Sequence, residues 1–438
     1  MIQRPRLHNL VKDNYRMLLF IFSRLKINNE GCYRHIGEEA AMAGSAAWPP
    51  IAKETLPWKS SVERAQVSRR EWALIHTPYE ASVTPEVAHL PVSVESDISA
   101  EASEVESMMS RFDADFGSVV APFSSLLLRS ESASSSEIEK LSASAQAVAE
   151  AEIGERQRGN AALVVANVHA MRAALSLADD ISHDTIITMH RTLLDDTAPE
   201  LTGAYRRQQV WIGGGPQSPH RALFVPPQAK RVQAAMADLV RFARRADVQA
   251  IPHIALAHAQ FETIHPFLDG NGRTGRALVQ AMFRSQGVTQ HVTVPVSAGL
   301  LADTDGYFAA LTAFREGDIE PIIRAFLQAT TRGIWNGRRL ANDINEITAR
   351  YNDLLSGIRS DSVAHRISGL LFRQPVVNVK SVIAETGSAP VNIYRALDSM
   401  AERGVIREAT SKRRNRIWVA DDIIDALDAF ATRSGKRR

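Results

Sequence analysis

The feature that most constrains the fold of this chain is the helical spacing of its apolar residues, which recurs over most of its length after residue 100. Around residues 108–120, apolar side chains return at steps of three and four positions, the spacing that places them on one face of an α-helix. The same pattern predicts further helices at residues 160–178, 182–194, 228–244, 252–264, 272–286, 304–315, 318–330 and 331–356. The sequence therefore predicts a mainly α-helical protein.

Few segments have the character of strands. Residues 208–212 and 222–225 lie on either side of a glycine- and proline-rich stretch at 213–216. This arrangement predicts a β-hairpin with a long tip. Residues 48–97 contain several prolines in short mixed segments, which predicts extended or irregular structure.

Composition and charge narrow the classes of protein that fit. The only cysteine is Cys32, so no intramolecular disulfide can form, which suits a cytoplasmic protein. The net charge of +2 gives no attraction of the whole chain to nucleic acid. The apolar run at 17–22 is too short to span a bilayer, so no membrane partner is expected. Met42 has a sequence context typical of a translation start, and residues 1–40 are interpreted as an extension without function.

The densest chemistry lies at residues 265–276, which read His-Pro-Phe-Leu-Asp-Gly-Asn-Gly-Arg-Thr-Gly-Arg. Glycines at positions 270 and 272 allow left-handed backbone and close approach of a ligand. Successive N–H groups in such a loop form a concave anion site, and the N-terminus of the helix that follows also favours phosphate. The string therefore predicts a phosphate-binding loop that opens a helix.

The side chains of this loop supply the other parts of a transfer reaction. Arg273 and Arg276 are suited to charge-assisted hydrogen bonds with phosphate oxygens. Asp269 is suited to holding a magnesium ion that bridges phosphates. His265 supplies a base whose ordinary pKa is near neutrality. A base, a metal ligand, an anion site and two arginines together indicate phosphoryl or nucleotidyl transfer.

Other common motifs fit these residues less well. An EF-hand loop that begins at Asp269 needs an acidic residue where the chain has Gln280. The Gly-Lys-Ser/Thr of a Walker loop is absent from the sequence. His253, His258 and His265 lack the four-residue spacing of a helical zinc-binding pair.

The string at 265–276 resembles the Fic signature His-Pro-Phe-x-Asp/Glu-Gly-Asn-Gly-Arg-x-x-Arg at every fixed position. Residues 255–264 resemble the helix that precedes this signature, and the resemblance runs from about residue 124 to 327. It implies a Fic-type helical bundle with a β-hairpin flap. It also implies transfer of AMP from ATP to a Tyr, Thr or Ser hydroxyl of a protein, including the chain itself. Some members move a phosphate, UMP or phosphocholine instead.

The resemblance assigns a role to most residues of the loop. His265 would deprotonate the target hydroxyl, Phe267 would anchor the loop and Asp269 would bind Mg²⁺. Asn271 would position the α-phosphate. His265, Asn271 and Arg273 are the predicted catalytic residues.

The same resemblance places the phosphates of ATP. The backbone from Gly270 to Gly272, with Arg273, would hold the β-phosphate. Arg276 would hold the γ-phosphate. The predicted nucleotide site is made of Gly270, Asn271, Gly272, Arg273, Gly275 and Arg276.

The expected hairpin resembles the flap of the family. The flap lies over the active site and adds the main chain of the target as a further strand, as strand-edge pairing allows. The residues that carry this resemblance are Trp211, Ile212, Gly213, Phe224 and Val225.

A second string, at residues 135–140, predicts regulation. Ser136 and Glu139 have the spacing of a capping box, which predicts the start of a helix. The string also resembles the family's inhibitory helix, Ser/Thr-x-x-x-Glu-Gly/Asn, at Ser135 and Glu139, and departs from it at Lys140. The resemblance implies that Glu139 pairs with Arg276 and occupies the place of the γ-phosphate. Simple capping is the competing interpretation, and removal of AMP with Glu139 positioning water is a further one.

The last part of the chain has a different character. Helices at 363–372 and 379–385, a third helix that ends before Gly404, and strands at 405–408 and 416–419 suggest a winged helix-turn-helix. The residues of its wing and third helix that suit DNA contact are Arg407, Lys412, Arg413, Arg414, Arg416, Asn392, Tyr394, Arg395 and Ser399. Such modules also serve as docking or dimer surfaces, so DNA binding through residues 388–416 and a homodimer both stay open. A DNA-binding regulator whose Fic domain senses nucleotide is the alternative function.

The length of 438 residues predicts more than one domain. The expected parts are the extension at 1–40, an N-terminal region at 41–155 with the inhibitory helix near 135–150, a Fic catalytic core at 156–335, a connecting helix at 336–360 and a winged helix-turn-helix at 361–438.

Overall fold

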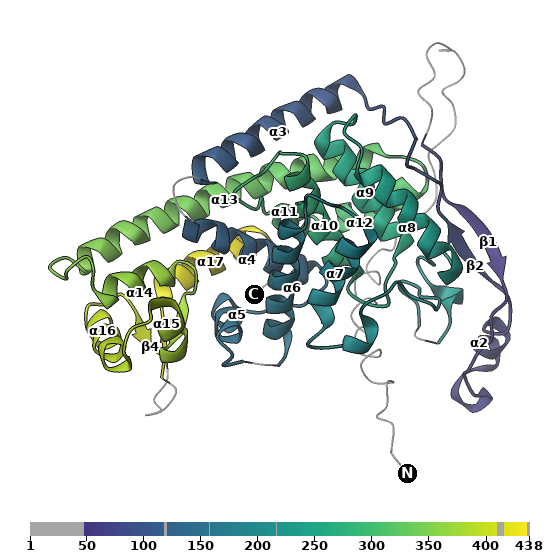
Figure 1. Cartoon of the computed structure of the whole chain (residues 1–438). Helices are drawn as coiled ribbons and strands as arrows, with labels where there is room; N and C mark the ends of the chain where they lie inside the picture. Colours follow the sequence, from purple (N-terminus) through teal and green to yellow (C-terminus); the bar gives the residue numbers. More distant parts are fainter. Residues whose placement is uncertain (1–47, 118–120, 157, 216, 410–415, 436–438) are drawn as a thin grey trace.

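The computed structural model describes residues 48–117, 121–156, 158–215, 217–409 and 416–435. The interpreted extension at 1–40, the start at Met42 and most of the basic wing loop lie outside these residues. The described chain is mainly helical, as predicted (Figure 1). Its helices before the catalytic loop are α2 (Arg69–Leu74), α3 (Ser96–Gly117), α4 (Ala121–Ile138), α5 (Ala145–Glu152), α6 (Asn160–Ser176), α7 (His183–Leu194), α8 (Ala229–Ala243) and α9 (Ala250–Ile264).

The later helices are α10 (Asn271–Ser285), α11 (Val296–Ala302), α12 (Thr304–Arg315), α13 (Glu320–Leu354), α14 (Val363–Leu371), α15 (Val379–Thr386), α16 (Pro390–Glu402) and α17 (Asp421–Arg433). Short 3₁₀ turns lie at Arg64–Gln66, Pro199–Leu201 and Pro219–Arg221. The predicted helices at 160–178, 182–194, 228–244, 252–264, 272–286 and 304–315 are present to within a few residues. Ser182 caps α7 through a hydrogen bond that its side chain accepts from the backbone N–H of Thr185.

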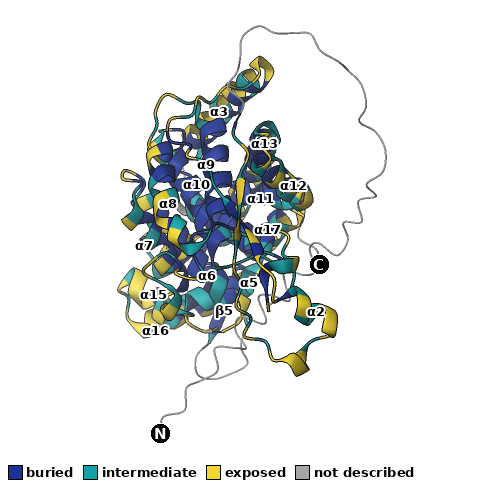
Figure 2. Ribbon diagram, turned by 90° about the vertical axis from the view of Figure 1, so that its right-hand side faces the viewer, coloured by how far each residue is buried: buried dark blue, intermediate teal, exposed yellow. Residues whose placement is uncertain are grey.

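The centre of the molecule is formed by α9 and α10. Residues 251–264 of α9 are all buried, because its sequence is apolar on nearly every face and neighbouring helices cover it. Figure 2 shows both helices as dark blue ribbons surrounded by helices with exposed faces. The loop that joins α9 to α10 is therefore held at both ends by the packed core.

The structure corrects the predicted helix start at Ser136. Residues 135 and 136 lie in the last turn of α4, and the chain then turns at Lys140 before α5 begins. The Ser136 hydroxyl donates a hydrogen bond to the carbonyl of Ser132 (2.9 Å) instead of capping a new helix. A serine and a glutamate three positions apart therefore marked the end of a helix here. The expected helix near 135–150 is the end of α4, a turn, and α5.

Helix α13 replaces two predicted elements. The helices expected at 318–330 and 331–356 form one continuous helix of 35 residues. The expected connecting helix at 336–360 is thus the second half of an element that begins in the core. Gly333 lies within this helix. A Cβ at Gly333 would lie 2.6 Å from the carbonyl oxygen of Pro295. The glycine allows α13 to pass close to the chain before α11, which was not predicted.

The predicted hairpin is present only in part. Residues 212 and 224 form a single antiparallel bridge, with Ile212 N–H donating to the Phe224 carbonyl (2.8 Å), and no regular strands extend from it. The carbonyl of Val225 instead accepts a hydrogen bond from Ser82 (3.0 Å). Ser82 belongs to β2 (Tyr79–Val83), which pairs antiparallel with β1 (Ala52–Leu56) in the region where irregular structure was expected. The flap is therefore tied to this small sheet.

The C-terminal part combines the helices α14, α15, α16 and α17 with a small sheet. Strands β3 (Val376–Asn378), β4 (Arg407–Glu408) and β5 (Ile417–Val419) form an antiparallel sheet in the order β3-β5-β4. The strand β3 and the last helix, α17, were not predicted. Figure 1 shows this part at one end of α13. Helix α17 returns to the core and packs against α13, α4 and α5. No helix of the described residues is long and apolar enough to cross a membrane.

Candidate functional site

The loop between α9 and α10 begins and ends with left-handed residues. His265 closes α9 with φ 52°, and Gly270 precedes α10 with φ 75°. A left-handed residue with a Cβ costs about 1–2 kcal/mol, so contacts around His265 must hold it in place. Phe267 is fully buried between these residues and stacks on the ring of His190, with 3.7 Å between centroids. Its position agrees with the expected anchor.

Two further contacts fix the middle of the loop. The side-chain amide of Asn271 accepts a hydrogen bond from Phe267 N–H (2.8 Å) and donates one to the Phe267 carbonyl (2.9 Å). His190, on α7, donates from Nε2 to the carbonyl of Asp269 (3.0 Å). Burial lowers the pKa of His190 to about 4, so its ring is neutral and Nε2 carries the hydrogen. His190 was missed, because nothing in its local sequence distinguishes it from a core histidine.

The imidazole of His265 is neutral at ordinary pH. Burial, followed by the charges of Arg206 and Arg315, lowers its pKa to about 3. About a fifth of the side chain is exposed, and Nδ1 lies 4.0 Å from a carboxylate oxygen of Glu262. A neutral, partly exposed imidazole has a free lone pair, which a general base requires.

The two arginines of the loop point to one place. Arg273 and Arg276 lie in the first turns of α10, and each side chain is only 3–4% exposed. The carboxylate of Glu139 bridges them: Arg273 Nε donates to Oε2 (2.8 Å) and Arg276 Nη2 donates to Oε1 (2.9 Å). Ser135 adds its hydroxyl and its carbonyl as acceptors for Arg276, both at 2.8 Å. The expected pairing of Glu139 with Arg276 is thus present, and it includes Arg273 as well.

This carboxylate lies where an anion site was predicted. Burial would raise the pKa of Glu139, but the charges and hydrogen bonds of Arg273 and Arg276 outweigh it and hold the pKa below its ordinary value. A Cβ at Gly272 would lie 2.5 Å from Glu139 Oε1. Only glycine at this position lets an anionic oxygen come so close to the backbone of the helix N-terminus.

Gly275 lies on the side of α10 that packs against α9. A Cβ there would lie 2.8 Å from Glu262 Oε1 and 2.9 Å from the ring of Phe261, both on α9. The glycine therefore permits close packing of α9 on α10. Its expected place in the nucleotide site remains a prediction.

The turn at Lys140 explains where this sequence departs from the inhibitory pattern. Lys140 has φ 63°, a left-handed conformation that glycine and asparagine adopt readily. The pattern's Gly/Asn stands at this position, so Lys140 adds backbone strain next to Glu139. The ion pairs of Glu139 are formed in spite of it.

Asp269 is the only predicted metal ligand. Its side chain is about one-third exposed, accepts a hydrogen bond from Gly270 N–H (2.8 Å) and lies 4.0 Å from Arg273. Among the described residues there is no group of three or more His, Cys, Asp or Glu side chains that forms a metal site. Mg²⁺ is commonly bound by one or two carboxylates together with substrate phosphates. Asp269, at the exposed side of the anion site, fits that arrangement.

The flap residues are held by aromatic contacts. Trp211 donates from Nε1 to the carbonyl of Gly215 (3.0 Å), and its ring meets Trp58 edge-on at 5.5 Å. The ring of Phe224 lies 3.7 Å below the guanidinium of Arg315. Leu223, between the bridge residues and the tip, is 55% exposed. Phe224 thus lies beside Arg315, whose charge also lowers the pKa of His265.

Behind the loop lie buried polar side chains that the sequence analysis did not identify. Burial raises the pKa of Glu262 to about 7, and Arg276 opposes that shift. His258 Nε2 and the hydroxyl of Tyr307 form a hydrogen bond (2.7 Å), and burial lowers the pKa of His258 to about 3. These groups come from α9 and α12, and only their burial beside Arg276 marks them.

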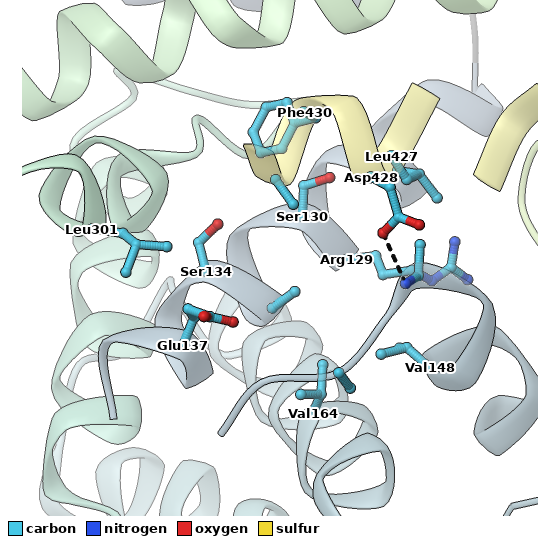
Figure 3. A pocket seen from close by; sticks show the side chains of 14 residues that line it. Arg129, Ser130, Ser134, Glu137, Val148, Val164, Leu301, Leu427, Asp428 and Phe430 are labelled. Atoms are coloured by element: carbon cyan, nitrogen blue, oxygen red, sulfur yellow. Dashed lines mark hydrogen bonds between the residues drawn. The ribbon is translucent and has the colours of Figure 1, made fainter. Parts of the chain in front are cut away.

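The opposite face of α4 borders a cavity. Figure 3 shows Ser130, Ser134 and Glu137 of α4 on one side and Phe430 of α17 on another. The cavity holds about 40 Å³, far below the size of usual ligand pockets. Ser135 and Glu139, which contact Arg276, do not line it. Helix α4 thus contacts the anion site on one face and α17 on another.

The described cations of the expected wing are already paired. Arg407 donates two hydrogen bonds to Asp421, both at 2.7 Å, and Arg416 pairs with Glu408 and Asp398. Asn392, Tyr394 and Arg395 are exposed on α16 as expected, and Ser399 is half-buried. Lys412, Arg413 and Arg414 lie outside the described residues. Arg407 and Arg416, two of the cations that suited DNA contact, are thus paired with carboxylates of the chain.

Comparison with known proteins identifies the segment that carries this site. Residues 180–283 match the model of the Fic/DOC family. The chain is 28% identical over 212 residues to the protein adenylyltransferase Fic of Drosophila yakuba, which covers 46% of this chain and 40% of that protein. It is 31% identical over 149 residues to the protein adenylyltransferase fic-1 of Caenorhabditis elegans, covering 33% of this chain and 26% of that protein. The chain thus contains a Fic/DOC domain and spans less than half the length of these relatives.

Solved structures of the same family are also similar. A Fic family protein from Desulfovibrio desulfuricans G20 matches with a TM-score of 0.49 and 20% identity, over 75% of this chain and 97% of that one. Fic-1 of C. elegans matches with a TM-score of 0.42 and 22% identity, over 56% of this chain and 73% of that one.

Proposed function

We propose that this chain transfers AMP from ATP to a hydroxyl side chain of a protein, and that Glu139 inhibits the transfer. The observation that carries the proposal is the bridge from Glu139 to Arg273 and Arg276, at the N-terminus of the helix that follows His265. A carboxylate held by two buried arginines marks the place that suits a phosphate group of ATP. The Fic/DOC match at residues 180–283 and the names of the curated relatives support adenylyl transfer.

In the proposed reaction the acceptor is a hydroxyl of a protein segment held along the flap. Nε2 of His265 takes the hydroxyl proton as the oxygen attacks the α-phosphorus of ATP. The bond from that phosphorus to the bridging oxygen breaks, and pyrophosphate leaves. Arg273 and Arg276 stabilise the charge that builds on the leaving group, the usual electrostatic contribution to phosphoryl chemistry. The negative phosphates of ATP raise the low pKa of His265, which suits a base.

A magnesium ion fits the same scheme. Asp269 would hold it, and the ion would supply positive charge that offsets the charge of the phosphates. Asn271 keeps the loop closed through its two bonds to Phe267, so that its second amide hydrogen is directed by the loop. In this scheme that hydrogen contacts the α-phosphate.

The inhibition follows from competition for the same charges. With Glu139 in place, Nη2 of Arg276 donates to Glu139 and to the Ser135 carbonyl, and its Nε donates to the Ser135 hydroxyl. A γ-phosphate at this position would stand against the Glu139 carboxylate, and like charges repel strongly where water is excluded. ATP therefore binds productively only after Glu139 leaves.

The experiment compares four proteins: wild type, Glu139→Gly, Glu139→Gly with His265→Ala, and the control Glu137→Gly. Glu137 lies on the same segment but faces the cavity beside α17. Each is incubated with magnesium and ATP labelled on the α- or the γ-phosphate, alone and with a bacterial lysate, and the intact mass is measured.

We expect α-label on protein with Glu139→Gly, at least tenfold above wild type and Glu137→Gly, and none once His265 is replaced. Transfer of γ-label would instead indicate a kinase-like orientation of ATP. Bound ATP without transfer of either label would contradict adenylyl transfer and favour a nucleotide sensor. Equal α-label in wild type and Glu139→Gly would contradict the inhibition.

A further inference from the structure

Arg206 connects parts of the site that are distant in the sequence. It stands between α7 and the flap, 59 residues before His265, and is only 4% exposed. Its backbone N–H donates to the carbonyl of Pro266 (2.9 Å), the residue after the proposed base. A buried arginine is uncommon unless its donors are used, so the partners of its guanidinium indicate its role.

One side of the guanidinium holds the end of α9. Nε donates to the carbonyl of His265 (2.8 Å) and Nη2 to the carbonyl of Ile264 (3.3 Å). The last carbonyls of a helix have no partner within the helix, and a cation is favourable there. His265 is also left-handed, and the bond to its carbonyl fixes that conformation. The direction of the imidazole thus depends on Arg206.

The other side holds both ends of the flap. Nη1 donates to the carbonyl of Gln208 (3.0 Å), and Nη2 also donates to the carbonyl of Pro227. The flap residues 211–225 lie between these two positions. A single planar group therefore contacts four carbonyls on the end of α9 and on both ends of the flap.

We propose that Arg206 is a positioning residue, which sets the distance between His265 and the flap that holds the acceptor hydroxyl. The inference rests on the proposed function. Arg206 touches neither ATP nor the reacting atoms; it acts through the two segments that do. Displacement of reacting groups by about 1 Å costs on the order of 100-fold in rate, so small changes at Arg206 have large effects on transfer.

The chemistry of arginine is specific to this role. Its five donors lie in one plane and reach several carbonyls at once, whereas lysine has one ammonium group at the end of a flexible stem. Burial lowers the pKa of Arg206 to about 10, and the side chain keeps its charge at neutral pH. Arg206→Lys therefore preserves the charge and removes most of the connections between the loop and the flap.

The test uses the full chain in the Glu139→Gly background, with Arg206→Lys and Arg206→Gln as variants. The matched control is Arg207→Lys, since Arg207 is the adjacent residue and is exposed. With ATP labelled on the α-phosphate, label on the protein itself and label released as free AMP are measured together. ATP affinity and the thermal midpoint are measured on the same samples. Hydrolysis of ATP to AMP uses water as the acceptor and does not need the flap. Release of free AMP therefore measures the effect of a variant on the catalytic loop alone.

We expect Arg206→Lys and Arg206→Gln to lower protein labelling about 10- to 100-fold. We also expect the ratio of free AMP to transferred AMP to rise, ATP affinity to stay within about twofold, and Arg207→Lys to match its parent. Labelling equal to the parent would overturn this inference alone. Loss of ATP affinity and of both products in equal proportion would overturn it in favour of a merely structural role. A Glu139→Gly parent that transfers no AMP would overturn the proposed function and this inference with it.

Discussion

Two regions of this molecule pair arginine with carboxylate groups at similar distances and in very different surroundings. At the start of α10, Arg273 and Arg276 are 3–4% exposed and share Glu139, which is 26% exposed. In the C-terminal sheet, Arg407 is 53% exposed and its partner Asp421 is 44% exposed, although its two hydrogen bonds of 2.7 Å are shorter. The shorter hydrogen bonds are thus those on the surface.

Burial has a larger influence than distance on what an ion pair does in this molecule. Exposed pairs contribute about 0–1 kcal/mol, because water and salt screen them. A buried pair adds little stability either, but it cannot lose one partner without a replacement. In the proposed function, a phosphate of ATP is that replacement for Glu139. The exposed pair in the C-terminal sheet can lose a partner to water at little cost.

The two regions also end a helix in the same way. The chain is left-handed with φ 63° at Lys140 after α4 and at Gly387 after α15. Glycine adopts this conformation without strain, whereas lysine does not. The segment that carries Glu139 thus keeps a strain that its counterpart avoids, in line with the tendency of strain to gather at functional sites.

The largest effect is expected from removing a buried cation. In the Glu139→Gly background, Arg276→Ala should lower AMP transfer about 100- to 1000-fold, since removal of one preorganised charge partner has that effect in other enzymes. Arg407→Ala, which removes an exposed cation of the C-terminal sheet, should leave transfer unchanged. Initial rates with α-labelled ATP measure both. An Arg276→Ala variant that keeps more than a tenth of the rate would contradict the expected difference between the buried and the exposed cation.

A second difference is expected in the pH dependence of stability. Burial raises the pKa of Glu262 to about 7 from 4.5, so the folded protein binds its proton more tightly than the unfolded chain does. The unfolding free energy should therefore fall as pH rises from about 4.5 to about 7, by up to about 3 kcal/mol from this group. Glu262→Gln should remove that part of the slope in urea unfolding, and Glu131, also near 7, should keep the rest.

The control for this pH dependence is Glu408→Gln. The hydrogen bond from Arg416 holds the pKa of Glu408 below its ordinary value of 4.5, so this residue is mostly ionised in both states above about pH 5.5. Its variant should keep the slope of the wild type. A slope between pH 5 and pH 7.5 that Glu262→Gln leaves intact would contradict the prediction.

Removing the charge of one carboxylate in each region compares the buried pair of Glu139 with the pair of Glu408 and Arg416. Glu139→Gln should lower the unfolding free energy by about 2 kcal/mol without ligand, because two buried arginines lose their counter-ion. Glu408→Gln should change it by less than about 0.5 kcal/mol. Urea unfolding at pH 7 and low salt provides the measurement. Equal losses in the two variants would mean that burial does not separate the pairs.

The smallest effect is expected at the two helix ends. Lys140→Gly should raise the unfolding free energy by about 1 kcal/mol, since it relieves a left-handed residue with a Cβ. Gly387→Lys should lower it by a similar amount, because a Cβ at Gly387 meets no other atom and only the backbone conformation is changed. Thermal midpoints of the two variants should move in opposite directions. A Lys140→Gly variant that loses stability would contradict the backbone strain inferred at Lys140.

Local patterns predicted much of this structure. The helices expected at 182–194 and 252–264 and the glycines at 270 and 272 each depend on patterns of nearby residues, and each is found where it was expected. The pairing of Glu139 with Arg276 was expected only from the resemblance to the Fic family. Residues 135–140 alone suggested a cap, and they end a helix instead.

The rest depends on contacts between distant segments. Arg206, His190 and Glu262 became visible only when burial and the carbonyls beside them were known, and no local spacing marks such residues. The break expected within α13 failed because Gly333 serves packing against the chain before α11. In the flap, the carbonyl of Val225 bonds to Ser82 of β2, a pairing with a distant segment that no local pattern predicts. Tertiary contacts decided each of these cases.

The order of the ion-pair partners along the chain has a consequence for biosynthesis. Glu139 precedes Arg276 by 137 residues, so α4 leaves the ribosome before the loop that it holds. At about 5–20 residues per second, the interval is on the order of ten seconds. Helix α4 is therefore already outside when α9 and α10 come together, and the loop folds against Glu139 from the beginning. Under the proposed inhibition, a newly made molecule is therefore inactive, and its first activity requires an event after synthesis.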